Sequence, residues 1–237
     1  MKFEGQSMSV APLDGGIVEL TMDLKGDSTN KFNALTLKEL REVVDKLKSD
    51  ASVKGLLVTS AKDVFVVGAD VTEFGGLFKK TDEEFLAWVV WVNRIFSDIE
   101  DLPFPTVTAI NGMAFGGGLE FPLSTCYRVA STAAKVGVPE VKLGIFPGWG
   151  GTVRLARLAG ADNAIEWVAG GEQFSAENGY KIGVIDAVVE PAKLRDAALD
   201  LLKLAMSGKV DWKARQAEKK SPVRLDSVES MMAFTRS

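Results

Sequence analysis

The chain has 237 residues, of which 46% are hydrophobic and 25% charged, enough to bury the core of one domain. Its net charge of −4 and its pI near 5.1 argue against a nucleic-acid binder, which needs a positive field. The sequence has no histidine and one cysteine, Cys126. This excludes internal disulfides, His-dependent nucleophilic catalysis and His-ligated zinc, and we expect no metal site.

The first predicted elements are a strand, a helix and a second strand. Residues 16–23 alternate β-branched and polar side chains, which predicts a strand followed by a turn-rich stretch over residues 25–33. From Thr36 the apolar residues recur at helical spacing, and Thr36 with Glu39 fits a capping box. Residues 55–59 then predict a short buried strand.

A longer helix and a third strand come next. The helix is predicted over residues 81–100, where Thr81 and Glu84 again fit a capping box. The strand, residues 106–110, runs directly into a glycine run that starts at Gly116. The order of strand, loop and helix therefore occurs twice.

The second half of the sequence continues the alternation. Residues 127–131 predict a strand, residues 138–146 an extended segment and residues 151–158 a helix. Further helices are predicted at residues 162–169, 175–181 and 192–206, with a strand at residues 184–189. These repeated units predict an α/β core with ligands near the loops that follow the strands.

The sequence changes character near its C-terminal end. We predict one domain over residues 1–207, then a basic, solvated connector over residues 208–237 in which residues 228–234 begin a helix. A basic arm for nucleic acid or acidic lipid is disfavoured by the acidic net charge. The N-terminal residues lack the apolar run of a signal peptide or membrane span, which favours a cytoplasmic protein without an integral membrane segment.

Three consecutive glycines, Gly116, Gly117 and Gly118, lie between a strand and a helix expected to begin near Glu120. A helix N-terminus has unpaired N–H groups and a partial positive charge, so it stabilises an oxygen that becomes anionic. The alternative is close packing of the helix on a strand, which also requires small residues. The pattern is neither GxGxxG nor a P-loop, so nucleotide phosphate is disfavoured.

The FVVGAD segment, within the loop of residues 60–70, is a second candidate donor site. Gly68 and Ala69 are small and follow a strand that should lie beside the first site. Two N–H donors would then converge. The alternative is a tight turn in which Asp70 caps a short helix.

Two carboxylates, Glu120 and Glu140, lie in apolar, glycine-rich segments. Burial should raise their pKa values. Two acids in one pocket can divide proton donation and acceptance between them. Either glutamate alone is more often a surface or salt-bridged residue, but the two together favour a catalytic pair.

These segments resemble the crotonase, or enoyl-CoA hydratase/isomerase, superfamily, and within it most closely the N-terminal hydratase/isomerase domains of bacterial multifunctional fatty-acid oxidation α subunits. The matching segments are NKFN at residues 30–33, FVVGADVTEF at 65–74, AINGMAFGGGLE at 109–120, VGVPEVKLGIFPGWGGTVRL at 136–155 and KIGVIDAVV at 181–189. Five segments in the right order are far more specific than one motif.

The resemblance implies a crotonase-like spiral of repeated ββα units with truncated C-terminal helices. It implies a thioester oxygen held by the N–H groups of Ala69 and Gly117, with Glu120 and Glu140 as the two acids. Glu140 would be the acid/base nearer C2, and Glu120 would deprotonate the water.

The resemblance also implies positions for water and for coenzyme A. Gly148 would help to place the reacting water, and Gly116 would border the substrate. The CoA moiety would contact Lys25, Lys31, Val67, Gly68 and Asp70. No separate cofactor is expected, because coenzyme A is part of the substrate.

The expected reaction is hydration of 2-trans-enoyl-CoA to 3-hydroxyacyl-CoA in fatty-acid β-oxidation, together with isomerisation of 3-enoyl-CoA. The expected partners are acyl-CoA and either further copies of the chain or a thiolase subunit. The alternative is an acyl-CoA-binding or partner-binding fragment with little turnover. Dehalogenation and thioester hydrolysis, which use constellations such as an Asp nucleophile, are disfavoured by the two glutamates.

Two departures from the family pattern concern the helix that carries Glu120. Pro122 follows the glutamate, where we expect it in the tolerated first turn. Cys126 replaces an Asp that relatives often have before the aromatic-Arg pair, here Tyr127 and Arg128. A local polar contact is therefore in doubt.

Overall fold

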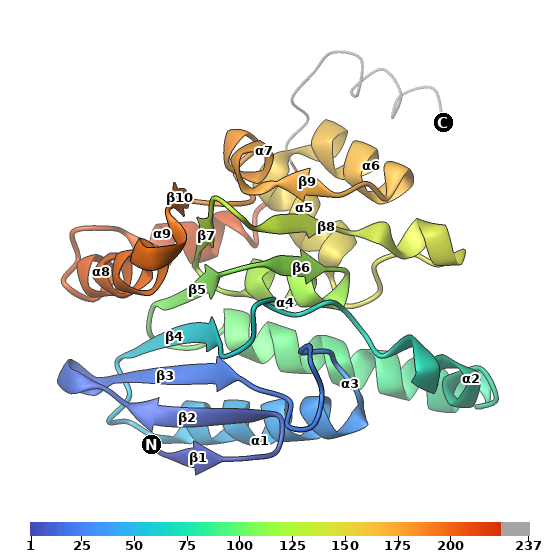
Figure 1. Cartoon of the computed structure of the whole chain (residues 1–237), viewed down its shortest axis with the longest axis horizontal. Helices are drawn as coiled ribbons and strands as arrows, with labels where there is room; N and C mark the ends of the chain where they lie inside the picture. Colours follow the sequence, from blue (N-terminus) through green and yellow to red (C-terminus); the bar gives the residue numbers. More distant parts are fainter. Residues whose placement is uncertain (224–237) are drawn as a thin grey trace.

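The computed structural model describes residues 1–223, which form two β-sheets surrounded by helices (Figure 1). The larger sheet has the order β1-β2-β3-β4-β5-β7-β10. Its strands are β1 (Phe3–Glu4), β2 (Met8–Pro12), β3 (Ile17–Met22), β4 (Gly55–Ser60), β5 (Thr106–Ile110), β7 (Tyr127–Ser131) and β10 (Ala187–Val189). Pairing is antiparallel from β1 to β3 and parallel from β3 to β10.

A second layer of short strands follows the first. Its three-stranded sheet has the order β6-β8-β9, formed by β6 (Met113–Phe115), β8 (Lys135–Gly137) and β9 (Phe174–Ser175). Isolated parallel bridges, Phe32 with Ala69 and Val66 with Ala114, extend this layer to the segments after β3 and β4. Each central strand thus has a short second strand or bridge after it, which confirms the predicted α/β spiral of ββα units.

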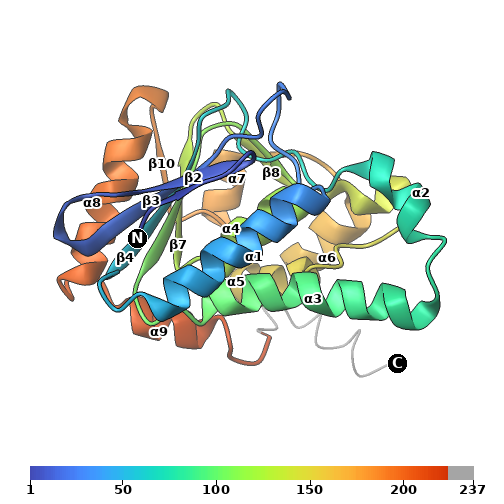
Figure 2. The same cartoon turned by 90° about the horizontal axis from the view of Figure 1, so that it is seen from below.

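Helices cover both faces of the larger sheet. They are α1 (Ala34–Ser49), α2 (Phe74–Leu77), α3 (Asp82–Glu100), α4 (Gly117–Ser124), α5 (Gly151–Ala159), α6 (Ala161–Gly170), α7 (Ala176–Lys181), α8 (Leu194–Met206) and α9 (Trp212–Glu218). Figure 2 shows α1 and α3 side by side, with α8 across the sheet from them. In the described residues, no helix is both long and apolar enough to cross a membrane.

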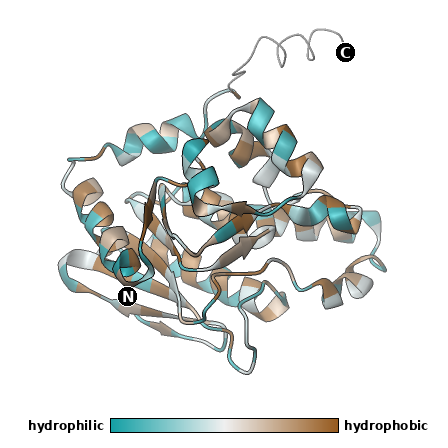
Figure 3. Ribbon diagram, turned by 45° about the horizontal axis from the view of Figure 1, so that its top comes forward, coloured by the Kyte–Doolittle hydropathy of each residue, from teal (hydrophilic) through white to brown (hydrophobic). Residues whose placement is uncertain are grey.

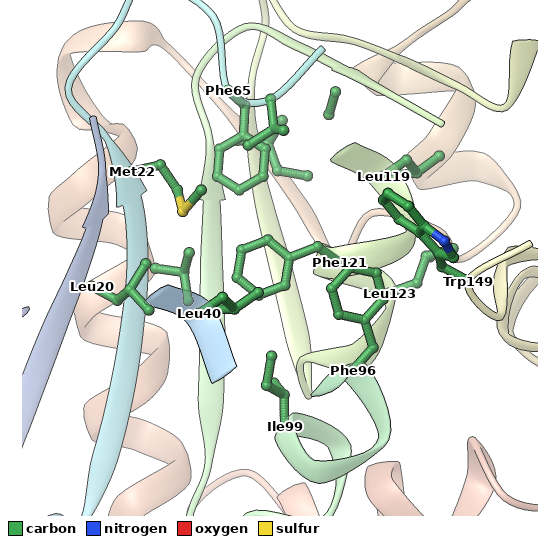
Figure 4. Packing of buried hydrophobic residues seen from close by; sticks show 14 of the residues in the cluster. Leu20, Met22, Leu40, Phe65, Phe96, Ile99, Leu119, Phe121, Leu123 and Trp149 are labelled. Carbon is green, nitrogen blue, oxygen red and sulfur yellow. The ribbon is translucent and has the colours of Figure 1, made fainter. Parts of the chain in front are cut away.

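The core is divided between the two faces of the sheet because strand residues alternate in direction. In β4, Leu56 and Val58 join the cluster under α1 and α3, while Leu57 joins the cluster under α8. Hydrophobic residues accordingly concentrate on the strands (Figure 3). Beneath the candidate site, Phe96 stacks on Phe121 with ring centroids 5.8 Å apart (Figure 4).

The predicted capping box at Thr36 and Glu39 is wrong. Helix α1 begins earlier, at Ala34, and the Asn33 side chain accepts the Thr36 N–H at 2.8 Å. Glu39 instead accepts the N–H groups of Gln6 and Ser7, each at 2.8 Å, which ties the N-terminal segment to α1. The second predicted capping box, at the start of α3, is confirmed.

Two further local predictions need correction. Residues 138–146 are not extended, because β8 ends at Gly137 and a 3-10 helix, Pro139–Leu143, follows. Helix α4 begins at Gly117, so Pro122 is its sixth residue and lies beyond the first turn. There Pro122 has no N–H to offer the carbonyl four residues earlier. Strands β1 and β2 were not predicted at all.

The start of the predicted connector is not a solvated arm. Residues 212–218 form α9, and Lys219 directly after it is 1% exposed. Lys219 Nζ donates to the carbonyls of Ser124 and Thr125 at the end of α4. The boundary at residue 207 stays a prediction, and the predicted helix at residues 228–234 lies outside the described residues.

Candidate active site

A cavity of about 590 Å³ opens beside the start of α4. Eight of the predicted site residues line it: Val67, Gly68, Ala69, Gly116, Gly117, Glu120, Glu140 and Gly148. They come from the loop after β4, the end of β6 with the first turn of α4, the 3-10 helix after β8 and the turn before α5. The remaining walls are mainly apolar and include Phe74, Phe78, Phe85, Leu143 and Phe146. The cavity therefore combines two acids with a large apolar surface.

Glu140 lies in the 3-10 helix, directly above the backbone of Gly116. A Cβ atom on Gly116 would lie 3.0 Å from Glu140 Oε1, and Gly116 has φ +52°, which disfavours other residues. Glu140 Oε2 is buried and has no hydrogen-bond partner among the described residues. A buried unpartnered carboxylate oxygen in a cavity is available to a ligand or a proton.

Glu120, the fourth residue of α4, is almost fully buried. Its Oε1 accepts the N–H of Trp149 at 2.8 Å and the N–H of Gly151 at 2.7 Å. Gly151 must lack a side chain, because its Cβ would lie 2.8 Å from the same Oε1. The PGWGG turn therefore holds Glu120 in one orientation.

Burial raises the pKa values of both acids. The pKa of Glu120 rises to about 8, chiefly by desolvation and then by the charge of Glu140, against the opposing effect of its two N–H donors. Desolvation also raises the pKa of Glu140, to about 7. Because the two groups interact, they titrate as a pair. A pair with these values holds a proton near neutral pH.

Two residues that line the same cavity, Gly117 and Ala69, have backbone N–H groups outside the regular hydrogen bonds of their elements. Gly117 is the first residue of α4, so its N–H has no acceptor within the helix. Ala69 lies in a bridge with Phe32 that uses the Gly68 carbonyl and the Asp70 N–H, which leaves the Ala69 N–H outside the bridge. An oxygen bound between these donors would be stabilised as it becomes negative.

The glycine triplet combines a cavity wall with close packing, and its use as an oxyanion site stays a prediction. Gly116 and Gly117 border the cavity, whereas Gly118 provides close packing: a Cβ there would overlap the Val66 carbonyl oxygen. The helix cap that the sequence offered as an alternative for Asp70 is present, since the Asp70 side chain caps a 3-10 helix by accepting the Thr72 N–H at 3.0 Å.

We expect Gly118→Ala to destabilise the protein by roughly 1–3 kcal/mol, because the added methyl group has no space against a backbone carbonyl. Urea unfolding would measure the change. The control is Gly75→Ala in α2, where no atom lies within 4 Å of the added Cβ. Alanine there should be neutral or stabilising by up to about 1 kcal/mol. Equal stability of Gly118→Ala and the native protein would contradict the packing role.

Comparison with known proteins identifies the family. The enoyl-CoA hydratase/isomerase family matches residues 13–231 of the chain. This chain belongs to the enoyl-CoA hydratase/isomerase family. The match covers both acids, both donor loops and the PGWGG turn.

The chain also matches one part of longer proteins. The chain is 58% identical, over 234 residues and 99% of its length, to the fatty acid oxidation complex subunit alpha of Pseudomonas syringae pv. tomato and to that of Pseudomonas aeruginosa. It spans only 32% and 33% of those two proteins. A crystal structure of an enoyl-CoA hydratase from Bacillus anthracis is similar with a TM-score of 0.77 and 26% identity, over 98% of this chain and 92% of that one.

The predicted CoA contacts lie partly outside the cavity of this enoyl-CoA hydratase/isomerase family member. Lys31 pairs with Asp27 and Asp70, each at 3.0 Å, and Lys25 pairs with Asp23. Neither lysine lines the large cavity. Their phosphate-binding role stays a prediction, and a phosphate would have to compete with these carboxylates.

Sequence reasoning missed the groups that orient Glu120. It selected Gly148 in the PGWGG segment but not the N–H groups of Trp149 and Gly151. The available signal was the predicted helix beginning at Gly151, because the first N–H groups of a helix have no internal acceptor. It also missed Asn93 in α3, which donates to the Gly148 carbonyl at 2.8 Å.

Proposed function

We propose that the chain hydrates 2-trans-enoyl-CoA to 3-hydroxyacyl-CoA. The observation that carries this proposal is the convergence of Glu120, Glu140 and the two N–H donors on one apolar cavity. The names of the relatives agree with it. Fatty-acid β-oxidation is the corresponding pathway, and the apolar walls suit an alkyl chain.

The geometry supports a two-acid mechanism. In the reactive form of the pair Glu120 is ionised and the one proton is on Glu140, although the higher pKa of Glu120 makes the opposite form the more populated. Ionised Glu120 takes a proton from water as the water oxygen bonds to C3. The C2–C3 π electrons move toward the thioester, whose oxygen becomes negative between the Ala69 and Gly117 N–H groups. Protonated Glu140 then gives its proton to C2. Preformed donors act most strongly on the charge of the transition state.

The same site supports isomerisation of 3-enoyl-CoA to 2-enoyl-CoA. Glu140 would remove a proton from C2 and return it at C4, while the oxyanion donors hold the dienolate. The carboxylate oxygen that has no protein partner is suited to this exchange. Glu120 has no water to activate in this reaction.

Purified chain mixed with crotonyl-CoA tests the proposal. The absorbance of the conjugated thioester should fall, and mass spectrometry should detect a product heavier by one water. Saturable binding without turnover would favour the acyl-CoA-binding alternative and reject the hydratase proposal. A series of acyl-chain lengths in the same assay would measure the use of the apolar wall.

We expect kcat/KM for hydration to be greatest between about pH 7 and 8. Burial raises both pKa values, so the pair loses its first proton near the lower value and its second near the upper one. Below this window no base is available, and above it no acid is available. Initial rates across pH 5 to 10 check this. A rate that already falls from about pH 5 upward would indicate ordinary carboxyl pKa values near 4.5. A rate that is constant from about pH 6 to 10 would reject the requirement for a protonated acid.

The proposed partners follow the same assignment. Acyl-CoA is the substrate, and no separate cofactor enters the proposed steps. Assembly with further copies of the chain or with a thiolase subunit stays a prediction. Light scattering of the chain, alone and mixed with a thiolase, would measure it.

A further inference from the structure

The segment around α9 is attached to the ends of the two helices beneath the active site. Gln216 donates to the carbonyls of Glu100 and Leu102 at the end of α3. Lys220 pairs with Asp101 at the surface. Between these two contacts the Lys219 side chain enters the interior, where it is 1% exposed.

Lys219 caps the C-terminal end of α4. Its ammonium group donates to Ser124 O at 2.8 Å and to Thr125 O at 3.0 Å. The last carbonyls of a helix lack internal partners and attract cations. The N-terminal end of the same helix supplies Gly117 and Glu120 to the cavity.

A buried ion chain leads from Lys219 to the PGWGG turn. Lys219 Nζ lies 3.1 Å from Glu100 Oε1, as an ion pair without hydrogen-bond alignment. Glu100 Oε2 accepts from Arg154 Nε at 3.1 Å. All three side chains are buried. The one carboxylate of Glu100 is shared by two cations, so removing Glu100 leaves two buried cations uncompensated, which is costly. Removing Lys219 leaves Glu100 with Arg154 as its ion-pair partner in this set.

Arg154 acts directly on the turn that holds Glu120. Its Nη1 donates to the Trp149 carbonyl at 3.1 Å, between the two N–H groups that bind Glu120 Oε1. Asn93 binds the preceding carbonyl, Gly148 O. In a trans peptide the C=O and N–H point in opposite directions. The Gly148 carbonyl and the Trp149 N–H belong to one peptide, so the hydrogen bond from Asn93 to that carbonyl directs the N–H toward Glu120. Arg154 fixes the following peptide, between Trp149 and Gly150, through its carbonyl.

We propose that Lys219 is a positioning residue that acts through Glu100 and Arg154 to keep the PGWGG turn bound to Glu120. The segment after α9 thereby determines the orientation of a catalytic acid that it does not touch. This inference rests on the proposed hydratase function for its kinetic test. Turnover by the native chain tests the function first, and the variants below test the ion chain separately.

The first test compares Lys219→Met with Lys220→Met. We expect Lys219→Met to lower kcat for crotonyl-CoA hydration by up to about 100-fold, with a smaller change in KM, because Glu120 is displaced. The N–H donors favour ionised Glu120, so their loss raises its pKa, which is the higher of the two, and moves the alkaline limb of the pH profile to higher pH. Lys220→Met, which loses only a surface pair, should leave kcat and the profile unchanged.

A second comparison identifies the route. The charged groups that face Glu120 are Glu140 and Arg154, with Glu100 and Lys219 behind Arg154. If Lys219 acts through Arg154, Lys219→Met should have no further effect on the profile in an Arg154→Met background. An equal shift in both backgrounds would instead indicate a direct field of the lysine and would overturn the proposed route.

Thermal unfolding of every variant separates positioning from stability. A Lys219→Met protein with a lower Tm but unchanged kcat and pH profile would overturn the proposal, since the lysine would then only stabilise the fold. If Lys219→Met does not fold, Glu100→Gln breaks the same chain while keeping the side-chain shape. It should shift the alkaline limb in the same direction, and an unshifted limb would reject the ion chain.

Discussion

Replacing Glu140 with Gln should lower hydration of crotonyl-CoA by about 10²–10⁴-fold, the usual contribution of a general acid or base. The amide has nearly the same shape as the carboxyl group, so the contact above Gly116 should persist. It cannot exchange a proton with C2. Steady-state rates at saturating substrate would measure the loss.

The matched control for this variant is Glu172→Gln. Glu172 is exposed and pairs with Lys142, which lies in the same 3-10 helix as Glu140. The control should keep native activity, because exposed pairs contribute little. Equal hydration rates for Glu140→Gln and the native chain would reject the mechanism.

A second substrate divides the roles of the two acids. The rate of 3-enoyl-CoA isomerisation should fall with Glu140→Gln as strongly as the rate of hydration does. In isomerisation Glu140 removes the proton from C2 and returns it at C4. Glu120→Gln should impair hydration more than isomerisation, since only hydration requires activated water. The reverse pattern would exchange the two assignments.

Gly117→Pro should lower kcat/KM by about 10²–10³-fold, the effect of removing one oxyanion donor. Proline has no N–H, and the first position of a helix tolerates its backbone geometry. A new Cβ at this position would, however, lie 2.5 Å from Trp149 Cζ3. The variant therefore changes both a donor and a packing contact.

Gly117→Ala separates these two effects. Alanine introduces the same Cβ contact with Trp149 and keeps the N–H, so the difference between the two variants isolates the donor. Crotonyl-CoA hydration should be much faster with alanine than with proline. Equal kcat/KM values would show that the Gly117 N–H does not stabilise the thioester oxygen.

The central strands were predictable because burial imposes a simple pattern on them. Strands β5 and β7 lie where the sequence places them, and both are buried throughout; β5, TVTAI, is a short run of apolar and β-branched residues. The first capping box failed because Asn33 competed for the same helix end and Glu39 found partners 32 and 33 residues away. Local spacing contains no information about such distant partners.

The residues that line the candidate site could be predicted from the sequence, but the residues that hold Glu120 in place could not. Glycines beside acids indicated the cavity, because the backbone must approach there. The partners of Glu120 could not be derived in the same way, since Arg154 acts through a carbonyl and Lys219 is 99 residues from Glu120 in sequence, 219 minus 120. A lysine in a basic, proline-containing stretch has no local feature that predicts burial.

The two proposed oxyanion donors lie on different turns of the spiral, which the short second layer of strands brings together beside the cavity. Val66 bridges Ala114, just before the glycine run, and Ala69 bridges Phe32. In the proposed mechanism the thioester oxygen requires a donor from each turn. The binding site therefore arises only when separate segments dock, a late event for contacts that are distant in sequence. Recovery of enzymatic activity during refolding should consequently lag behind recovery of helical circular dichroism.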